Sequence, residues 1–346
     1  MPWSRIGQSY DRVDGDRVIS YREAIREATD QAMVHDPRVF AIGLDVDDKF
    51  GVFGSMLGMT HPERVIGTPI SENAIMGVAI GAALSGLRPV VVHLRVDFML
   101  LAMDQLVNYA AKWRYMTQGQ VKVPLTVRAV IGRGWGCGAQ HSATLPSLFA
   151  HIPGLKVTMP SNPYQAKGLL LSAIAHDYPV IQIEHRHLYN DTCHVPTEMF
   201  ALPLGRGEIV RRGSQLTAVT MSMGTIDTLK ACERDGLDAE VIDLRTVKPL
   251  DEDIILESVR RTGRLLVVDY DFPFAGVAAE ITTRVVEKAF HDLREAPQRL
   301  TFPECSTPAS GVLEKAYYPS VDTIAARIKV MLSRSPQAAE GGVPLE

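Results

Sequence analysis

Short, continuous runs of Val, Ile and Leu alternate with helical segments along nearly the whole chain. In the first half such runs occupy residues 38–44, 88–94, 124–130, 155–160 and 179–185. A strand that is apolar on both of its faces must be covered on both, which is typical of a parallel sheet between two layers of helices. The pattern therefore predicts an α/β fold.

The alternation stops once and then restarts. Residues 188–204 include two prolines and have no regular periodicity, which is typical of a linker. Beyond them, apolar runs at 216–222, 239–244 and 264–270 again alternate with helical segments. Because 346 residues exceed the usual size of one core, two domains are expected. We predict a leader at 1–19, an α/β domain at 20–187, the linker at 188–204, a smaller α/β domain at 205–334 and a disordered tail at 335–346.

Composition narrows the function classes. A formal net charge of -4, without any run of Lys and Arg, gives no reason to expect a nucleic-acid partner. The four cysteines are far apart and have no metal-ligand spacing, which suits reduced thiols and predicts no metal site in this chain. The N-terminus has no apolar signal-peptide core, and no apolar run reaches membrane-spanning length. We expect a cytoplasmic protein with no membrane partner.

One acid, Glu72, stands at the start of a helix that is otherwise free of charge. It lies in the stretch TPISENAIMGVAIGAALSGL, and no residue from Asn73 to Leu87 carries a charge. The small and aliphatic residues predict a helix that is buried on most of its surface. The acid could simply complement the helix dipole, or it could be placed there for chemistry.

Four stretches together resemble one known family, in the same order along the chain. They are TPISENAI (68–75) and the segments 95–116, 139–170 and 239–264. They resemble the β subunit of the thiamine diphosphate-dependent 2-oxoacid dehydrogenase first component, a transketolase-like group that includes the pyruvate and branched-chain types. The resemblance covers roughly residues 20–330. It implies a pyrimidine-binding parallel-sheet domain and a smaller α/β domain of the transketolase C-terminal type.

The resemblance also assigns roles to residues. In this family a glutamate, matched by Glu72, binds a ring nitrogen of the cofactor's aminopyrimidine and favours the imino form that takes the proton from the thiazolium carbon. Phe98 matches the aromatic ring that stacks on the aminopyrimidine, and Ile70 matches an apolar contact to the same ring. His141 matches a histidine that lines the substrate channel. Glu72 and His141 are thus the predicted catalytic residues, and Glu72, Phe98 and Ile70 bind the cofactor.

Some residues depart from the family pattern. Leu44 stands where the family commonly has a glutamate that is thought to link paired active sites. Leu94 and Arg95 replace an apolar pair close to Phe98, with His93 beside them. A guanidinium suits a substrate with a phosphate, a second carboxylate or several hydroxyls, so Arg95 and His93 are predicted substrate residues. The alternative is that Arg95 pairs with a local acid such as Asp97.

His185 and His187 add further polarity where the family more often has Pro and an apolar residue. The glycine-rich stretch 132–138 has neither dinucleotide-fold nor phosphate-loop spacing, so it is expected to form a turn near the cofactor. The chain also contains no Gly-Asp-Gly, the sequence with which the family binds magnesium and diphosphate. An α subunit is therefore expected to hold Mg²⁺ and the diphosphate, most simply in an α2β2 heterotetramer. The small residues Gly77, Gly81 and Ser85 could let such a subunit approach closely, or could serve packing within the domain.

We therefore predict the β subunit of a two-subunit thiamine diphosphate enzyme. It would decarboxylate a small-molecule 2-oxoacid oxidatively and pass the acyl group to a lipoyl carrier on an acyltransferase. One alternative is a two-subunit transketolase or acyloin-forming lyase that acts on a polar or phosphorylated substrate. Another is a non-catalytic scaffold subunit, against which the retention of Glu72, Phe98 and His141 argues.

Overall fold

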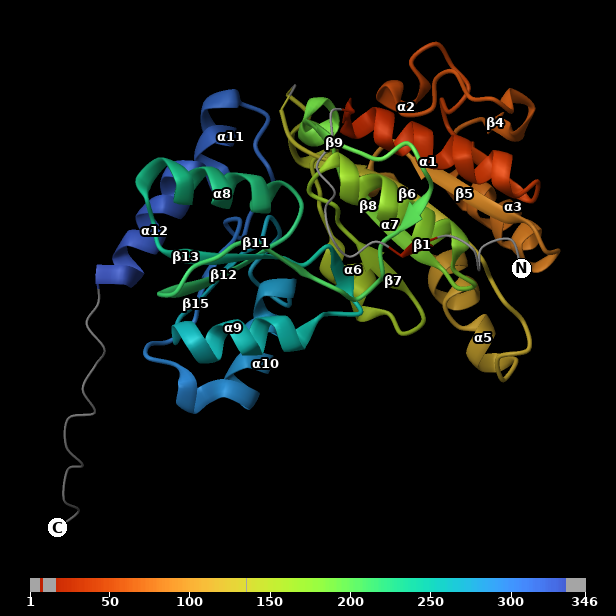
Figure 1. Ribbon diagram of the computed structural model, residues 1–346. Helices are drawn as coiled ribbons and strands as arrows, with labels where there is room; N and C mark the ends of the chain where they lie inside the picture. The colour runs from red at the N-terminus through yellow and green to blue at the C-terminus, as the bar shows by residue number, and fades with distance from the viewer. Residues whose placement is uncertain (1–6, 9–16, 135, 334–346) are drawn as a thin grey trace. The chain divides into compact units, whose positions relative to one another are not determined.

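The computed structural model describes residues 7–8, 17–134 and 136–333, and the chain forms two compact units (Figure 1). Unit 1 comprises the described residues up to Arg206 together with Arg245–Leu250 and Ser306–Lys315. Unit 2 comprises Gly207–Leu244, Asp251–Cys305 and the described residues from Ala316 on. Two later segments, 245–250 and 306–315, thus belong to unit 1. The predicted division into domains at 20–187 and 205–334 does not include these returns. The predicted tail and most of the predicted leader lie outside the described residues.

Unit 1 is built on a seven-stranded sheet with the order β14-β7-β8-β6-β5-β3-β4. All neighbouring strands are parallel except β14, which is antiparallel to β7. The three strands β5, β6 and β8 are buried along their whole length. The α/β class is therefore confirmed. The strands are β3 (Val39–Gly43), β4 (Val65–Gly67), β5 (Arg88–His93), β6 (Thr126–Ile131), β7 (Lys156–Thr158), β8 (Val180–His185) and β14 (Thr246–Lys248).

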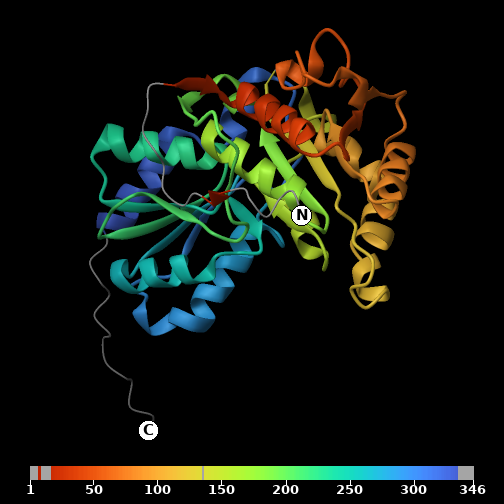
Figure 2. The same cartoon turned by 45° about the vertical axis from the view of Figure 1, so that its right-hand side comes forward.

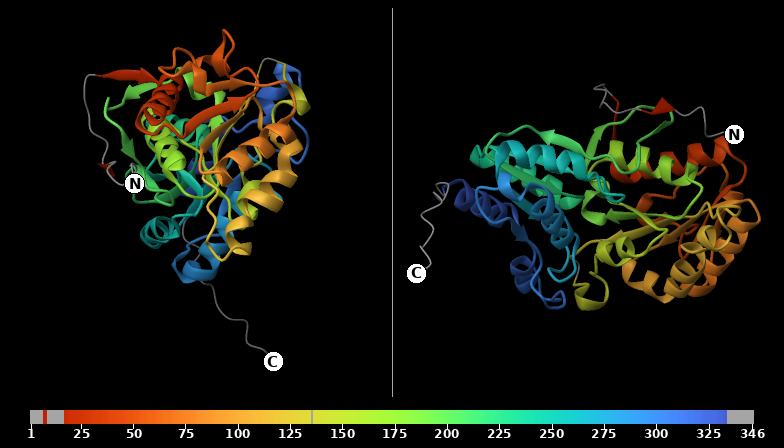
Figure 3. Two further views of the ribbon diagram at one scale, coloured as in Figure 1. Left: turned by 90° about the vertical axis from the view of Figure 1, so that its right-hand side faces the viewer. Right: turned by 90° about the horizontal axis from the view of Figure 1, so that it is seen from below.

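Helices cover both faces of this sheet, as the continuous apolar strands require. On one face α1 (Tyr21–His35) lies beside α7 (Pro163–Ala175), and α3 (Glu72–Leu84) lies on the other (Figure 3). Helix α1 begins with a capping box, in which the amide of Ser20 donates to Glu23 Oε2 at 2.7 Å. Shorter helices are α2 (Gly51–Gly54), η2 (Pro62–Arg64), η5 (Gly138–Gln140) and α6 (Pro146–His151).

The helical segment from Val96 to Met116 changes pitch several times. It consists of α4 (Val96–Met99), the 3-10 turn η3 (Leu100–Ala102), the π-helical η4 (Gln105–Ala110) and α5 (Trp113–Met116). The amide of Ala111 donates to the carbonyl of Leu106 at 2.9 Å, one residue further back than in an α-helix. This wider turn keeps Leu106, Ala110 and Ala111 buried.

The stretch 188–204, predicted as a linker, is instead packed into unit 1. It contains the end of η6 (Arg186–Asn190), then β9 (Thr192–His194), which pairs with β2 (Val18–Ser20), and β10 (Phe200–Ala201), which pairs with β1 (Gly7–Gln8). Its apolar side chains form a buried cluster with two residues of α7. The cluster is Val195, Phe200, Leu202, Tyr164 and Leu169. Burial against a helix, rather than regular periodicity, orders this stretch.

Unit 2 is a smaller five-stranded α/β layer with the order β11-β13-β12-β15-β16, in which only the pair β11–β13 is antiparallel. Helices α8 and α12 cover one face and α9 and α10 the other (Figure 2). No helix in the described residues is long and apolar enough to cross a bilayer. The elements are β11 (Glu208–Arg211), β12 (Leu216–Thr220), α8 (Met223–Asp235), β13 (Ala239–Asp243), α9 (Glu252–Thr262), β15 (Leu265–Val268), α10 (Val277–Ala289), η7 (Phe290–Asp292), β16 (Gln298–Leu300) and α12 (Val321–Ser333). Helix α11 (Gly311–Tyr317) begins in the part of unit 1 that lies at 306–315.

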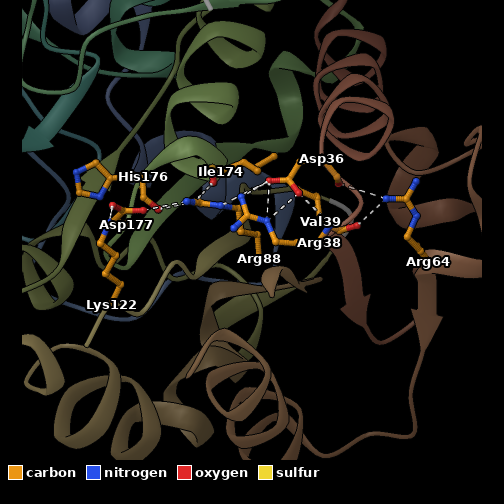
Figure 4. A network of polar contacts seen from close by, with 9 residues as sticks. All are labelled: Asp36, Arg38, Val39, Arg64, Arg88, Lys122, Ile174, His176 and Asp177. Atoms are coloured by element: carbon orange, nitrogen blue, oxygen red, sulfur yellow. Dashed lines mark hydrogen bonds and ion pairs between the residues drawn. The ribbon is translucent and has the colours of Figure 1, made fainter. Parts of the chain in front are cut away.

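A polar network closes the amino-terminal edge of the unit 1 sheet, where β5 begins (Figure 4). Arg88 donates to the carbonyls of Ile174 and His176 at 2.9 and 3.1 Å and to Asp177 Oδ1 at 2.9 Å. Lys122 also binds Asp177, at 2.5 Å. Burial opposes the charge of Asp177, but the hydrogen bonds from Lys122 and Arg88 outweigh it and lower its pKa. A hollow of about 640 Å³ borders this network.

In unit 2 two buried acids, Asp269 and Asp271, follow β15 directly. They are 1% and 2% exposed. The amide of Ala278, in the first turn of α10, donates to Asp269 Oδ2 at 3.0 Å. Burial, and then the neighbouring charge of Asp271, raises the pKa of Asp269 to about 7. Unit 2 is therefore most stable when one of these acids is neutral.

Replacing Asp269 by Asn should flatten the pH dependence of the free energy of unfolding. A pKa that is higher in the folded chain than in the unfolded chain stabilises the fold fully below the unfolded value, and this contribution is lost as the pH rises through the folded value. For Asp269 that window runs from 3.8 to about 7. Above it, Asp269→Asn should exceed the wild type by roughly a few kcal/mol in denaturant titrations. The exposed Asp253 provides the control, Asp253→Asn. Parallel loss of stability in Asp269→Asn and the wild type would contradict a neutral buried acid.

Candidate functional site

The rings of Phe98 and His141 meet at the carboxyl edge of the unit 1 sheet. Phe98 lies in α4 just after β5, and His141 follows η5 after β6. Because β5 and β6 are adjacent and parallel, the segments that follow them emerge side by side. The ring centroids are 5.2 Å apart with an interplanar angle of 81°, an edge-to-face contact. Both side chains are half-buried, so part of each ring stays accessible.

Asp97 ties the segment of His141 to α4. Its Oδ1 accepts a hydrogen bond from the amide of Ala143 at 3.1 Å. Burial raises the pKa of Asp97 despite this bond. Among the described residues, the buried Asp97 Oδ2 and Ser142 Oγ have no hydrogen-bond partner. Sequence reasoning considered Asp97 only as a partner for Arg95 and missed this role, which only the pairing of the two strands reveals.

Glu72 is the first residue of α3, and its carboxylate is available to a ligand. The side chain of Ser71 makes no capping hydrogen bond, and within the described residues the Glu72 carboxylate has no hydrogen bond or ion pair. It is half-buried, whereas Ile70 just before it is 75% exposed. No polar or ring contact joins either residue to Phe98 or His141 in the described part of the chain. The structure therefore shows direct contact between Phe98 and His141, whereas Glu72 and Ile70 leave their side chains accessible without touching those two rings.

Helix α3 is half exposed, which corrects the prediction that most of its surface is buried. Ile75, Met76, Ala79, Ile80 and Ala83 face the sheet. The opposite face exposes small and apolar residues. These are Ala74, Gly77, Val78, Gly81, Leu84 and Ser85. A Cβ added at Gly77 or Gly81 would meet no atom within 4 Å. These glycines therefore do not serve packing within the described part of unit 1.

Arg95 does not form an ion pair with Asp97. Its guanidinium donates instead to the carbonyl of Gly132 at 3.2 Å and to Sγ of Cys137 at 3.5 Å. Both partners belong to the glycine loop, which we define as residues 132–134 and 136–138. The predicted turn therefore lies against Arg95, a contact that no pattern in the sequence indicates.

His93, the last residue of β5, is 4% exposed, and its Nε2 has no partner among the described residues. Burial lowers its pKa to about 4, so the ring is neutral at physiological pH. A neutral ring can still donate or accept one hydrogen bond. In the described part of the chain, no group of three or more His, Cys, Asp and Glu is placed to hold a metal ion.

Known proteins match this chain over both units. A family model described as "Transketolase, pyrimidine binding domain" matches residues 17–192, and "Transketolase, C-terminal domain" matches residues 205–324. The chain is 42% identical to the acetoin:2,6-dichlorophenolindophenol oxidoreductase subunit beta of Cupriavidus necator, over 90% of this chain and 96% of the relative. It is 39% identical to the pyruvate dehydrogenase E1 component subunit beta of Rickettsia felis, over 90% and 97%. It is 37% identical to the 2-oxoisovalerate dehydrogenase subunit beta of Bacillus subtilis, over 90% and 98%.

Among solved structures, the fold resembles a split-gene transketolase described as an inactive beta4 tetramer. The TM-score is 0.73 at 21% sequence identity, over 91% of this chain and 98% of the other. A transketolase mutant from Pichia stipitis gives a TM-score of 0.66 at 15% identity, over 96% of this chain and 48% of the other. At these identities the likeness concerns the fold alone.

Replacing Asp97 by Ala should loosen the segment of His141. Loss of the acceptor leaves the amide of Ala143 without its partner, so its hydrogen exchange should accelerate roughly 10-fold or more, as for the loss of one hydrogen bond. Asp97→Asn retains an acceptor oxygen and should restore slow exchange. The control is Asp104→Ala, which removes only a surface bond to Asn108. Unchanged exchange at Ala143 in Asp97→Ala would show that other contacts hold the segment.

Proposed function

Since this chain belongs to the transketolase-like family of thiamine diphosphate-dependent 2-oxoacid dehydrogenase E1 β subunits, we propose that it is the catalytic β subunit of such an enzyme. Its reaction is the oxidative decarboxylation of a 2-oxoacid, with transfer of the acyl group to a lipoyl carrier. The observation that carries the proposal is the unpartnered carboxylate of Glu72 at the start of α3, next to the exposed Ile70.

The residues present fit the pyrimidine end of the cofactor. An aminopyrimidine ring requires a flat apolar surface and an acid at its edge. Phe98 and Ile70 provide accessible apolar surface, and the Glu72 carboxylate has no competing partner in the described residues. Glu72, Phe98 and Ile70 are therefore the residues that would hold this ring.

When bound, thiamine diphosphate would supply a nucleophilic carbon for the reaction with a 2-oxoacid. Glu72 holds a proton at the ring nitrogen that it binds, and so sets the tautomer of the aminopyrimidine. His141, packed against Phe98, presents an imidazole that can hydrogen-bond the substrate carboxylate or carbonyl. Asp97 fixes the backbone of the His141 segment through Ala143 and thereby orients the imidazole.

A partner α subunit completes this site. The chain has no Gly-Asp-Gly for magnesium and diphosphate, and its relatives are named as β subunits. The exposed face of α3 suits close approach of another subunit, because Gly77 and Gly81 have open space around them. An α2β2 assembly with Mg²⁺ held by the α subunit, and a lipoyl acyltransferase as acceptor of the acyl group, are parts of the same proposal.

A second candidate substrate class comes from the relatives. Two of them, at 42% and 41% identity, are named acetoin:2,6-dichlorophenolindophenol oxidoreductase subunit beta. Cleavage of a 2-hydroxyketone uses the same nucleophilic carbon. A substrate screen of the α/β complex with pyruvate, 2-oxoisovalerate and acetoin distinguishes the two. The relatives give the transketolase and scaffold alternatives no support over a dehydrogenase.

Replacing Glu72 by Gln should abolish most turnover while leaving assembly intact. Gln keeps the shape and one hydrogen bond but cannot share a proton, so kcat should fall by about 10²–10⁴-fold. Single-turnover kinetics of the assembled enzyme measures this, with binding of thiamine diphosphate followed separately by calorimetry. The control is Glu63→Gln, whose side chain is 66% exposed. Near-normal turnover in Glu72→Gln would leave Glu72 only a role toward the helix dipole.

Replacing Val78 by Asp should weaken association with the α subunit. Val78 is 59% exposed in the middle of the α3 face, and a buried carboxylate there would lack a partner. The chain alone should bind thiamine diphosphate only weakly, and addition of the α subunit should give tight, magnesium-dependent binding. In Val78→Asp this tight binding should appear only at a higher concentration of the α subunit. Val34→Asp is the matched control, because Val34 is 58% exposed on α1 across the sheet. Micromolar binding by the isolated chain would refute the two-subunit site.

A further inference from the structure

Basic side chains gather where three adjacent strands of the unit 1 sheet end. Strands β5, β6 and β8 are neighbours and parallel. Arg95 follows β5, the glycine loop with Arg133 follows β6, and His185, Arg186 and His187 end or follow β8. We name Arg95, Arg133, His185, Arg186 and His187 the basic cluster.

Short contacts hold the basic cluster together. His187 Nε2 lies 3.0 Å from the carbonyl oxygen of Arg133, and the rings of His185 and His187 have centroids 5.3 Å apart. A Cβ added at Gly132 would lie 3.4 Å from the backbone nitrogen of Arg186. Arg95 itself binds the carbonyl of Gly132. The three segments are thus in direct contact.

The charge of Arg95 has no opposite charge bound to it. Arg95 is only 6% exposed. No carboxylate in the described residues forms an ion pair with it. A buried guanidinium without an anion is costly. Three acids lie on the surrounding segments. Asp97, whose charge Arg95 favours without an ion pair, accepts from the amide of Ala143. Glu184 is bound to Arg128, and Glu314 accepts from the amide of Gly134 at 2.6 Å.

The charge of Arg95 contributes to shifts in the pKa values of two neighbouring groups. Burial and then the charges of His187, Arg133 and Arg95 lower the pKa of His185 well below its ordinary value. Burial and then Arg95 also lower the pKa of Arg186. Cations therefore repel one another inside the basic cluster, and an anion placed among them would relieve that repulsion.

The basic cluster adjoins the proposed reaction site. The amide of Phe98 donates to the carbonyl of Arg95 at 3.3 Å, so one turn of chain separates the two side chains. On the other side, Arg95 binds Cys137, and the amide of His141 donates to the carbonyl of the next residue, Gly138. Arg95 thus lies between the segments that carry Phe98 and His141.

We propose that Arg95 and the basic cluster bind an anionic group of the substrate, a carboxylate or a phosphate, at the end remote from the reacting carbonyl. This rests on the proposed function, which it deepens by naming a substrate class. Guanidinium groups bind such anions through paired hydrogen bonds, and the histidines can donate further ones. A substrate of this class carries a charge that an aliphatic 2-oxoacid or acetoin lacks at that end.

The first test is binding of inorganic phosphate to the α/β complex, measured by calorimetry. The complex is saturated with thiamine diphosphate and Mg²⁺ beforehand, so that the diphosphate site is filled. Arg95→Leu should weaken phosphate binding about 10- to 100-fold, the value of one charge-assisted pair. Arg88→Leu is the matched control. Arg88 is also an arginine that is only 6% exposed, but it begins β5 at the opposite edge of the sheet. Its affinity for phosphate should equal that of the wild type.

Two further variants keep the test decisive if the leucine variant does not fold. Arg95→Lys retains the charge and should keep phosphate binding within a few fold, and Arg133→Leu should weaken it. Equal phosphate affinity in the wild type, Arg95→Leu and Arg133→Leu would overturn the anion site. Arg95 would then serve only to hold the glycine loop.

The second test distinguishes the failure of this proposal from the failure of the proposed function. The wild type should have a higher kcat/KM for 2-oxoglutarate than for 2-oxopentanoate, which has the same length but no carboxylate at the remote end. Arg95→Leu should reverse that preference mainly through KM. Phosphate esters of 2-oxoacids test the phosphate source. If the wild type prefers 2-oxopentanoate over both 2-oxoglutarate and the phosphate esters, the proposal is overturned and the enzyme assignment stands. Arg95-dependent phosphate binding without turnover of any 2-oxoacid would uphold the anion site and overturn the proposed function.

Discussion

The ion pair between Arg128 of β6 and Glu184 of β8 is the interaction on which the carboxyl edge of the unit 1 sheet depends. Both side chains are fully enclosed, and the guanidinium binds both carboxylate oxygens, at 2.7 and 2.9 Å. Ser55 and the hydroxyl of Tyr189 complete the hydrogen bonding at 2.7 Å each. Loss of one partner from such a pair costs about 3–5 kcal/mol, because an unpaired charge stays behind. The pair therefore fixes the register of two strands, of which β6 leads into the glycine loop and β8 ends at His185.

Everything proposed for this chain is arranged around that edge. Parallel strands end together, so the segments after β5, β6 and β8 bring Phe98, His141 and the basic cluster into one region. Glu72 is positioned differently, because it is the first residue of helix α3 rather than part of a segment that follows one of these three strands. At the opposite edge Asp177 balances the charge of Arg88, whereas no carboxylate in the described residues pairs with Arg95. Ion pairs thus stabilise one edge, and at the other edge Arg95 has no ion-pair partner in the described part of the chain.

The sequence predicted the buried strands and their alternation with helices, because these depend on local periodicity. It was wrong where packing between distant segments decides. The stretch 188–204 is ordered by burial of Val195 and Leu202 against α7, which no periodicity signals. The apolar composition of α3 predicted burial of most of its surface, but one face is exposed. An exposed apolar face of this kind can bind a partner subunit.

By itself the sequence determined the α/β class, the family resemblance and the identity of the residues that chemistry would need, because residue type and order carry that information directly. Only the tertiary structure decided which of them meet. Arg95 binds the carbonyl of Gly132 rather than Asp97, and Asp97 instead holds the amide of Ala143. Both outcomes follow from the order of β5, β6 and β8 in the sheet. A chain that is read in one dimension contains the side chains of a site, but strand order sets the distances between them.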